Sequence, residues 1–242
     1  MKDASTGESS KWGSLAMPSV VAAAHELKAP LVLLRQLSYQ LEIVGDLTPE
    51  QKIIQQRLRL TAERSLRLVE NITQTGRLDE TLFALEPLHV RSVWEGVEGE
   101  MKPLAEQLDQ RIKLTVPKKP LLVIAHKELL PAVLTGLCDN ALAHNPKGET
   151  VTLAAKRHDD EVVFSVRDHG PKIDASTFRQ LEGRLGIAPQ PLGSRPGSSG
   201  LGLWIAGNFA RAMSARLSVT RHRAGGMTFS LHVPQSGQLS LL

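Results

Sequence analysis

What the 242-residue sequence lacks narrows its class before any motif is considered. Cys138 is its one cysteine, so no disulfide can form within the chain and nothing demands an oxidising compartment. Aromatic residues make up 4%, which leaves few platforms on which the bases of a single-stranded nucleic acid could stack. The 29 basic residues barely exceed the 25 acidic ones, and this balance does not favour nucleic acid as a direct partner.

Long apolar runs are missing as well. The longest, such as residues 31–34 and 121–125, fall far short of the ~20 residues that span a bilayer. Residues 1–14 are polar and rich in glycine and serine, unlike a secretory signal segment. We therefore expect a cytoplasmic protein with no membrane segment in this chain, whose sensor would lie upstream or on a partner.

Residues 20–79 show no strand pattern. Apolar residues recur every seven positions, with a second set between them: Val20, Leu27, Leu34 and Leu41, then Ala24, Leu31 and Ser38. This spacing predicts a helix packed against other helices. A turn follows, because Gly45 suits a helix end, Thr48 can cap the next helix and Pro49 fits its first position.

A second helix follows this turn. Residues on one face alternate at spacings of three and four: Ile54, Leu58, Thr61, Ser65, Leu68 and Ile72. Two amphipathic helices joined by a short turn form an antiparallel hairpin. A lone hairpin of this length leaves a long apolar stripe uncovered, and a second copy is its simplest cover. We therefore predict a homodimer with a four-helix bundle.

From about residue 85 the pattern changes to strands and helices. Predicted strands cover residues 113–116, 121–124, 151–156, 162–167, 215–220 and 227–233, and predicted helices cover residues 91–109, 127–144, 175–185 and 202–213. Proline, glycine and serine concentrate in residues 186–200, which predicts a loop. Helices on one side of a mixed sheet form an α/β sandwich, so the whole chain is predicted to be α+β.

The first candidate site lies on the first helix. His25 is off the centre of the apolar seam, where it can reach solvent. Glu26 beside it can accept a ring proton, which leaves the other ring nitrogen a nucleophile. A lone histidine on a helix is more often an ordinary surface residue. Pro30 strengthens the functional interpretation, because a proline inside a helix bends it and costs roughly 3 kcal/mol unless something offsets it.

Three further motifs lie in the second half. Asn140, on a predicted helix, could give its carboxamide oxygen to a hydrated Mg²⁺. At the end of a predicted strand, Asp168 could accept from an exocyclic amine, and Gly170 would let the backbone approach a base. The glycines of residues 197–203 open a helix and offer N–H groups to phosphates. Each motif alone also fits an ordinary cap, turn or helix start, whereas their order and spacing are more specific.

With the four motifs in this order, the chain resembles the catalytic core of the sensor histidine kinases. That core is a dimerisation and histidine-phosphotransfer hairpin followed by a Bergerat-type ATP-binding domain of the GHKL superfamily. The H box corresponds to residues 25–31, the end of the N box to Asn140, and the G1 and G2 boxes to residues 168–170 and 200–203. Residues 225–229 resemble the closing hairpin of that domain. The implied boundaries are a disordered N-terminal segment (1–18), the hairpin (19–82), the ATP-binding domain (86–235) and a tail (236–242).

The resemblance also implies a role for each residue. His25 would be the phosphoacceptor and Glu26 its assisting acid or base. Asn140 would hold Mg²⁺, while Asp168 would bind the adenine amine of ATP. The other implied nucleotide-binding residues are Gly170, His144, Lys172, Gly200, Leu201 and Gly202. A lid would span residues 171–199, and its candidate γ-phosphate partners are Lys172, Arg184 and Arg195.

The implied function is ATP-dependent autophosphorylation of His25, followed by transfer to an aspartate on the receiver domain of a response regulator. Two departures keep an alternative open. Gly136 and Lys172 stand where the family usually has asparagine and glycine, and both could lower ATP affinity or turnover. The alternative is a catalytically weak, ATP-binding dimeric scaffold that docks a receiver domain. Ala29 stands where the family usually has threonine or asparagine, so we expect weak phosphatase activity.

Overall fold

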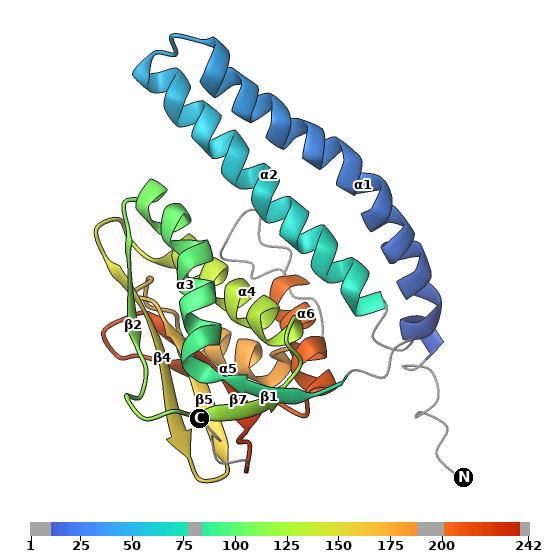
Figure 1. Ribbon diagram of the computed structural model, residues 1–242, viewed down its shortest axis with the longest axis vertical. Helices are drawn as coiled ribbons and strands as arrows, with labels where there is room; N and C mark the ends of the chain where they lie inside the picture. Colours follow the sequence, from blue (N-terminus) through green and yellow to red (C-terminus); the bar gives the residue numbers. More distant parts are fainter. Residues whose placement is uncertain (1–10, 77–83, 188–200, 238–242) are drawn as a thin grey trace. The chain divides into compact units, whose positions relative to one another are not determined.

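The computed structural model describes residues 11–76, 84–187 and 201–237. The chain divides into two compact units, Met1–Thr81 and Leu82–Leu242, which we call the hairpin unit and the sheet unit. The hairpin unit consists of α1 (Lys11–Val44) and α2 (Pro49–Gly76) (Figure 1). Because α1 begins at Lys11, the expectation of a disordered segment through residue 18 is wrong for residues 11–18. Residues 1–10 lie outside the described part.

The turn between the two helices has the predicted chemistry. Thr48 Oγ1 accepts a hydrogen bond from the Gln51 N–H at 3.3 Å, and Gln51 Oε1 accepts from the Thr48 N–H at 2.9 Å. This reciprocal capping box satisfies two backbone donors that a helix start otherwise leaves without partners. It begins α2 at Pro49, the position where a missing N–H costs nothing.

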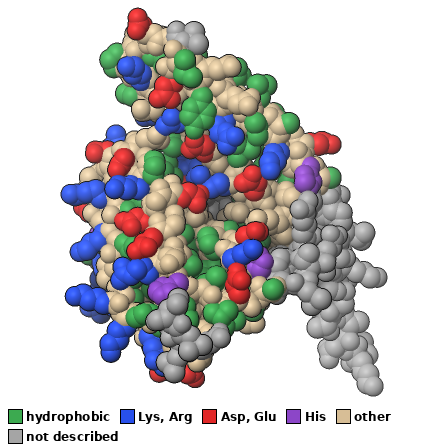
Figure 2. Space-filling view, in the orientation of Figure 1, with side chains coloured by type: hydrophobic (Ala, Val, Ile, Leu, Met, Phe, Trp, Pro, Cys, Tyr) green, Lys and Arg blue, Asp and Glu red, His purple; other side chains and the backbone are tan. Residues whose placement is uncertain are grey.

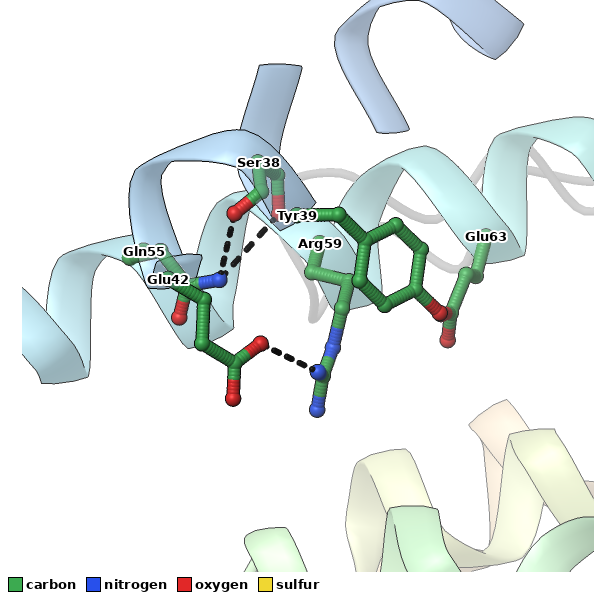
Figure 3. Close-up of polar contacts among 6 residues, drawn as sticks. All are labelled: Ser38, Tyr39, Glu42, Gln55, Arg59 and Glu63. Atoms are coloured by element: carbon green, nitrogen blue, oxygen red, sulfur yellow. Dashed lines mark hydrogen bonds and ion pairs between the residues drawn. The ribbon is translucent and has the colours of Figure 1, made fainter. Parts of the chain in front are cut away.

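Small and polar side chains line much of the contact between α1 and α2. The buried residues of the hairpin unit are Ala24, Ser38, Gln55, Ala62, Leu66, Val69 and Thr75. Gln55 Nε2 donates to the Ser38 carbonyl oxygen at 2.7 Å, which satisfies a buried polar group inside the hairpin (Figure 3). Small side chains let the two helix backbones approach closely, and Leu66 and Val69 are the large apolar residues that this unit buries.

The large apolar residues instead face outward along both helices. The exposed ones are Leu27, Leu33, Leu34, Leu37, Tyr39, Leu41, Ile43, Ile53, Ile54 and Leu58. The space-filling view shows hydrophobic side chains on the surface of this unit, interspersed with charged ones (Figure 2). Large exposed apolar patches are typical of interaction sites. The heptad leucines Leu27, Leu34 and Leu41 are therefore uncovered in a single hairpin, which is the property from which dimerisation was predicted.

The sheet unit is a two-layer α/β sandwich (Figure 1). Its strands are β1 (Glu86–His89), β2 (Arg111–Thr115), β3 (Leu122–Ala125), β4 (Thr150–His158), β5 (Glu161–Arg167), β6 (Arg216–Arg221) and β7 (Met227–Pro234). Its helices are α3 (Val90–Gln107), α4 (Leu129–His144), α5 (Ala175–Arg184) and α6 (Leu201–Ala212). The main sheet has the order β2-β4-β5-β7-β6, in which β2 and β4 are parallel and the other neighbours antiparallel. β1 and β3 form a separate antiparallel pair.

One face of the main sheet carries the core. Alternate residues of β4, β5 and β7 are buried, and α3, α4 and α6 cover that face (Figure 1). Trp94 of α3 lies with its ring centroid 5.8 Å from that of Phe164 on β5, and its indole N–H donates to the Ala154 carbonyl at 3.2 Å. These contacts hold α3 against β4 and β5, and β5 is the strand whose end leads into the candidate site.

The predicted strands and helices of this half are all present, with ends shifted by a few residues. The sequence reasoning missed β1, because Pro87 within a short apolar stretch argues against a strand. Ser236, assigned to the tail, is buried and its N–H donates to the Leu122 carbonyl at 3.0 Å, so the sheet unit extends to this residue. Within the described residues no helix combines the length and apolar character needed to cross a membrane.

Candidate functional site

Asp168 directly follows β5 and is 1% exposed. Its Oδ1 accepts from the N–H groups of Gly170 at 2.7 Å and Met227 at 3.3 Å, while its own N–H donates to the Met227 carbonyl at 3.0 Å. Its Oδ2 is buried and has no hydrogen-bond partner among the described residues. Burial raises the pKa of this carboxyl group, and the two N–H donors only partly offset that effect. One oxygen of this buried carboxylate therefore receives no hydrogen bond from the described residues.

Glycines around this carboxylate make room for close approach of the backbone. A Cβ on Gly170 would lie 2.8 Å from Asp168 Oδ1 and 3.0 Å from the His144 carbonyl oxygen. Gly226 has φ +77°, and a Cβ there would lie 2.9 Å from the His169 Cα. Gly226 and Met227, at the start of β7, therefore support Asp168 directly. The sequence reasoning noticed this glycine pair as a closing hairpin but gave neither Gly226 nor Met227 a place in the site.

Asn145 is a second supporting residue that the sequence reasoning missed. It is 6% exposed, ends α4, and its Oδ1 accepts from the His169 N–H at 2.9 Å. Gln110 Nε2 in turn donates to the carbonyl oxygens of Leu142 at 3.0 Å and Asn145 at 2.8 Å. The bond from His169 fastens the end of α4 to the turn that carries Asp168, and the two bonds from Gln110 hold that helix end in place. An asparagine after a helix gives no sequence signal for a bond to a residue 24 positions away.

Asn140 lies on α4, about one turn before the Asn145 cap. Its side chain is half-buried and makes no hydrogen bond with the described residues, whereas Leu137 and Ala141 beside it are buried. Its carboxamide is therefore available to an added ligand. His144 is half-buried, and its backbone carbonyl lies against Gly170. Within the described residues no group of three His, Cys, Asp or Glu side chains could hold a metal ion.

The predicted phosphate side of the site is described only in part. Gly200 and Arg195 lie outside the described residues. Leu201 is the first residue of α6, and Gly202 is exposed, with no atom of the described residues within 4 Å of the position that a Cβ would take. A ligand can therefore approach the backbone here, where a helix start presents N–H groups and a positive dipole end. Lys172 is exposed beside the Asp168 turn.

His25 and Glu26 both lie exposed on α1 in the hairpin unit. α1 continues through Pro30 as one helix to Val44. Both side chains are thus open to solvent.

Comparison with known proteins finds a family model and several sensor proteins that are similar to this chain. Residues 125–237 match the family described as histidine kinase-, DNA gyrase B-, and HSP90-like ATPase. The "Probable sensor histidine kinase TcrY" of Mycobacterium tuberculosis is 28% identical over 90% of this chain and 46% of its own length. The sensor protein SphS of Synechococcus elongatus is 27% identical over 90% and 54%, and the sensor protein CreC of Escherichia coli is 29% identical over 88% and 44%. The chain spans about half the length of these relatives.

Solved structures show the same fold. Full-length ShkA, crystallised in complex with AMPPNP, aligns with 93% of this chain and 47% of its own at a TM-score of 0.65 and 24% identity. The mycobacterial sensor histidine kinase MprB aligns with 63% of this chain and 100% of its own at a TM-score of 0.54 and 21% identity. Residues 125–237 thus match the histidine kinase-, DNA gyrase B- and HSP90-like ATPase family, and the chain as a whole is similar to sensor histidine kinases over 88–90% of its length.

Proposed function

We propose that this chain is an ATP-dependent protein histidine kinase. The observation that carries the proposal is the buried carboxylate of Asp168, with Oδ1 held by two backbone N–H groups and Oδ2 without a partner among the described residues. An unpaired buried acceptor is costly, and the exocyclic amine of adenine would satisfy it. Gly170 lets the backbone pack against the carboxylate, where a Cβ would lie 2.8 Å from Oδ1, so that its N–H holds Oδ1 and Oδ2 is left for the base.

The phosphates would then extend toward the start of α6. Gly202 lies exposed in the first turn of α6, where a helix start presents backbone N–H groups, and Lys172 is exposed near the first residue of the predicted lid. Asn140 would hold Mg²⁺ through its unpaired carboxamide oxygen, because Mg²⁺ takes few protein ligands when phosphates supply others. When bound, the ion would neutralise charge that develops on the transferred group.

His25 would accept the γ-phosphoryl group. A ring nitrogen of His25 forms the new P–N bond while the bond from the γ-phosphorus to its bridging oxygen breaks and ADP leaves. The proton lost from the ring passes to the Glu26 carboxylate, which lies next to it in the chain and is equally exposed. Transfer to a receiver aspartate would then break the P–N bond and form an acyl phosphate, and the exposed position of His25 supports access by such a partner.

The hairpin unit would dimerise through its outward apolar residues. The stripe at Leu27, Leu34 and Leu41 is about half-exposed at each position, with values of 53%, 53% and 48%. Full burial of an exposed leucine contributes about 1.5–3 kcal/mol, so covering the exposed half of each side chain contributes roughly 1 kcal/mol. A second copy would cover this stripe on both hairpins at once and give the four-helix bundle.

Radiolabelling tests the proposal. The full chain is incubated with Mg²⁺ and ATP labelled in its γ-phosphate, beside His25→Gln and the control His158→Gln, an exposed histidine of the sheet unit. We expect label that is lost in acid, stable in alkali, present in the control and absent from His25→Gln. ATP binding without any label would favour the scaffold alternative. Absence of ATP binding would remove the nucleotide site assigned to Asp168.

A further inference from the structure

We propose that Arg221 is a positioning residue that fastens the start of the predicted lid to the same hairpin that supports the base carboxylate. The described part of that lid, residues 171–187, is called the lid segment. Arg221 ends β6, and its Nη1 donates to the Ile173 carbonyl at 3.0 Å. Its guanidinium carbon also lies 5.7 Å from the ring centroid of Phe178 on α5. One side chain thus holds two points of the lid segment.

The two attachment points bracket the start of α5. Asp174, between them, caps this helix by accepting from the N–H groups of Ser176 at 2.8 Å and Thr177 at 2.9 Å. Hydrogen bonds from the hydroxyl and N–H groups of these two residues hold the pKa of Asp174 well below its usual range, so the cap stays ionised. The cap fixes where α5 begins, and Arg221 fixes where that beginning lies relative to β6.

The same β6–β7 hairpin touches the base carboxylate. Arg221 is paired across the sheet with Met227, whose N–H donates to Asp168 Oδ1. At the tip of the hairpin, a Cβ on Gly225 would lie 3.0 Å from the Gly170 carbonyl oxygen. One pair of strands therefore contacts the base side of the site through Met227 and the lid segment through Arg221.

A second arginine holds the other end of the lid segment. Arg211 of α6 donates through Nη1 to the Gly186 carbonyl at 2.9 Å and through Nη2 to Asn208 Oδ1 at 2.7 Å. Gly186, with φ +69°, packs directly against Gly207 of the same helix, where either Cβ would clash. The lid segment is thus anchored to β6 at one end and to α6, the helix of the predicted phosphate loop, at the other.

Arginine suits this task better than lysine. Its planar guanidinium can donate along its edge to a carbonyl while its face lies over an aromatic ring, and it is less strongly hydrated than an ammonium group. Lysine at position 221 would keep the charge but could not make both contacts in the same geometry. The consequence for nucleotide binding rests on the proposed function, whereas the anchoring itself concerns the protein alone.

Amide hydrogen exchange of the full chain tests the anchoring without nucleotide. The variants are Arg221→Gln, Arg221→Lys and the control Arg223→Gln, an exposed arginine of the same hairpin. We expect exchange in residues 173–187 to become about tenfold faster in Arg221→Gln, less so in Arg221→Lys, and to stay unchanged in the control. If Arg221→Gln also loosens β4 and β5, the comparison is made with Arg221→Lys. Unchanged protection of the lid segment in both Arg221 variants would overturn the proposal.

Titration with ATP and with adenosine then distinguishes an effect of Arg221 on the lid segment from an effect on the binding of the base. We expect the Kd for ATP to rise about fivefold in Arg221→Gln, while the Kd for adenosine stays unchanged, because adenosine lacks the phosphates that the lid covers. An equal rise in Kd for both ligands would mean that Arg221 affects binding of the base, and it would overturn the assignment of Arg221 to the lid segment. If the wild-type protein binds neither ligand, the proposed function fails, but the exchange result still decides whether Arg221 anchors the segment.

Discussion

Replacing Asp168 by asparagine should make the protein more stable and at the same time unable to recognise adenine. The Asp168 side chain is 1% exposed, and an asparagine in its place could still accept from the Gly170 and Met227 N–H groups through its single oxygen. The amide nitrogen of the new side chain would take the place of Oδ2, which has no partner among the described residues. The substitution therefore keeps the shape and two hydrogen bonds and removes a buried charge.

The pH dependence of this effect has a definite sign. Burial raises the pKa of Asp168 above the ordinary value of 3.8. A raised pKa in the folded state means that stability is greatest below the ordinary pKa and is lost as the pH rises through the raised one. At neutral pH the ionised Asp168 carboxylate therefore lowers the free energy of unfolding. Asp168→Asn should increase the free energy of unfolding by about 1 kcal/mol, or about 2–4 °C in Tm for a unit of this size. The gain should shrink as the pH falls.

Binding should change in the opposite direction. An amide N–H₂ group facing the adenine amine sets donor against donor, so ATP should bind about 10- to 100-fold more weakly. Thermal unfolding followed by tryptophan fluorescence, to which Trp94 and Trp204 of the sheet unit contribute, measures the first effect over a pH series. Titration calorimetry with ATP measures the second. A variant that is destabilised at neutral pH, or that binds ATP as well as the wild type, would refute the reasoning.

Three further outcomes follow from other positions. Asn145→Ala leaves the His169 N–H without its acceptor, so it should destabilise the sheet unit by about 1–3 kcal/mol and weaken ATP binding, as denaturant titration and calorimetry would reveal. Leu34→Asp combined with Leu58→Asp should raise the dimer dissociation constant at least about 100-fold in sedimentation equilibrium, whereas Ile187→Asp, at an exposed apolar residue of the sheet unit, should leave it unchanged. Ala29→Thr should increase dephosphorylation of a phosphorylated receiver domain, and an unchanged rate would contradict the explanation offered for weak phosphatase activity.

Local patterns predicted the elements of the sheet unit well, because alternation and helical periodicity are properties of neighbouring residues. The contacts that support Asp168 were not predictable in the same way. Met227, which donates to its Oδ1, lies 59 positions further along the chain, and only the pairing of β5 with β7 brings the two together. β1 was missed for a different reason, since Pro87 is tolerated only because that strand has a single neighbour.

The hairpin unit shows the limit of periodicity most clearly. The sequence predicted a seven-residue seam at Leu27, Leu34 and Leu41, and it also placed Ala24 and Ser38 on the same repeat between those leucines. Spacing alone does not decide which set faces the other helix of the hairpin. Side-chain volume decides it: Ala24 and Ser38 are 3% and 2% exposed because small residues allow α1 and α2 to approach, and the leucines are left outward. The residues that would drive dimerisation are therefore those that the hairpin itself has no room to bury.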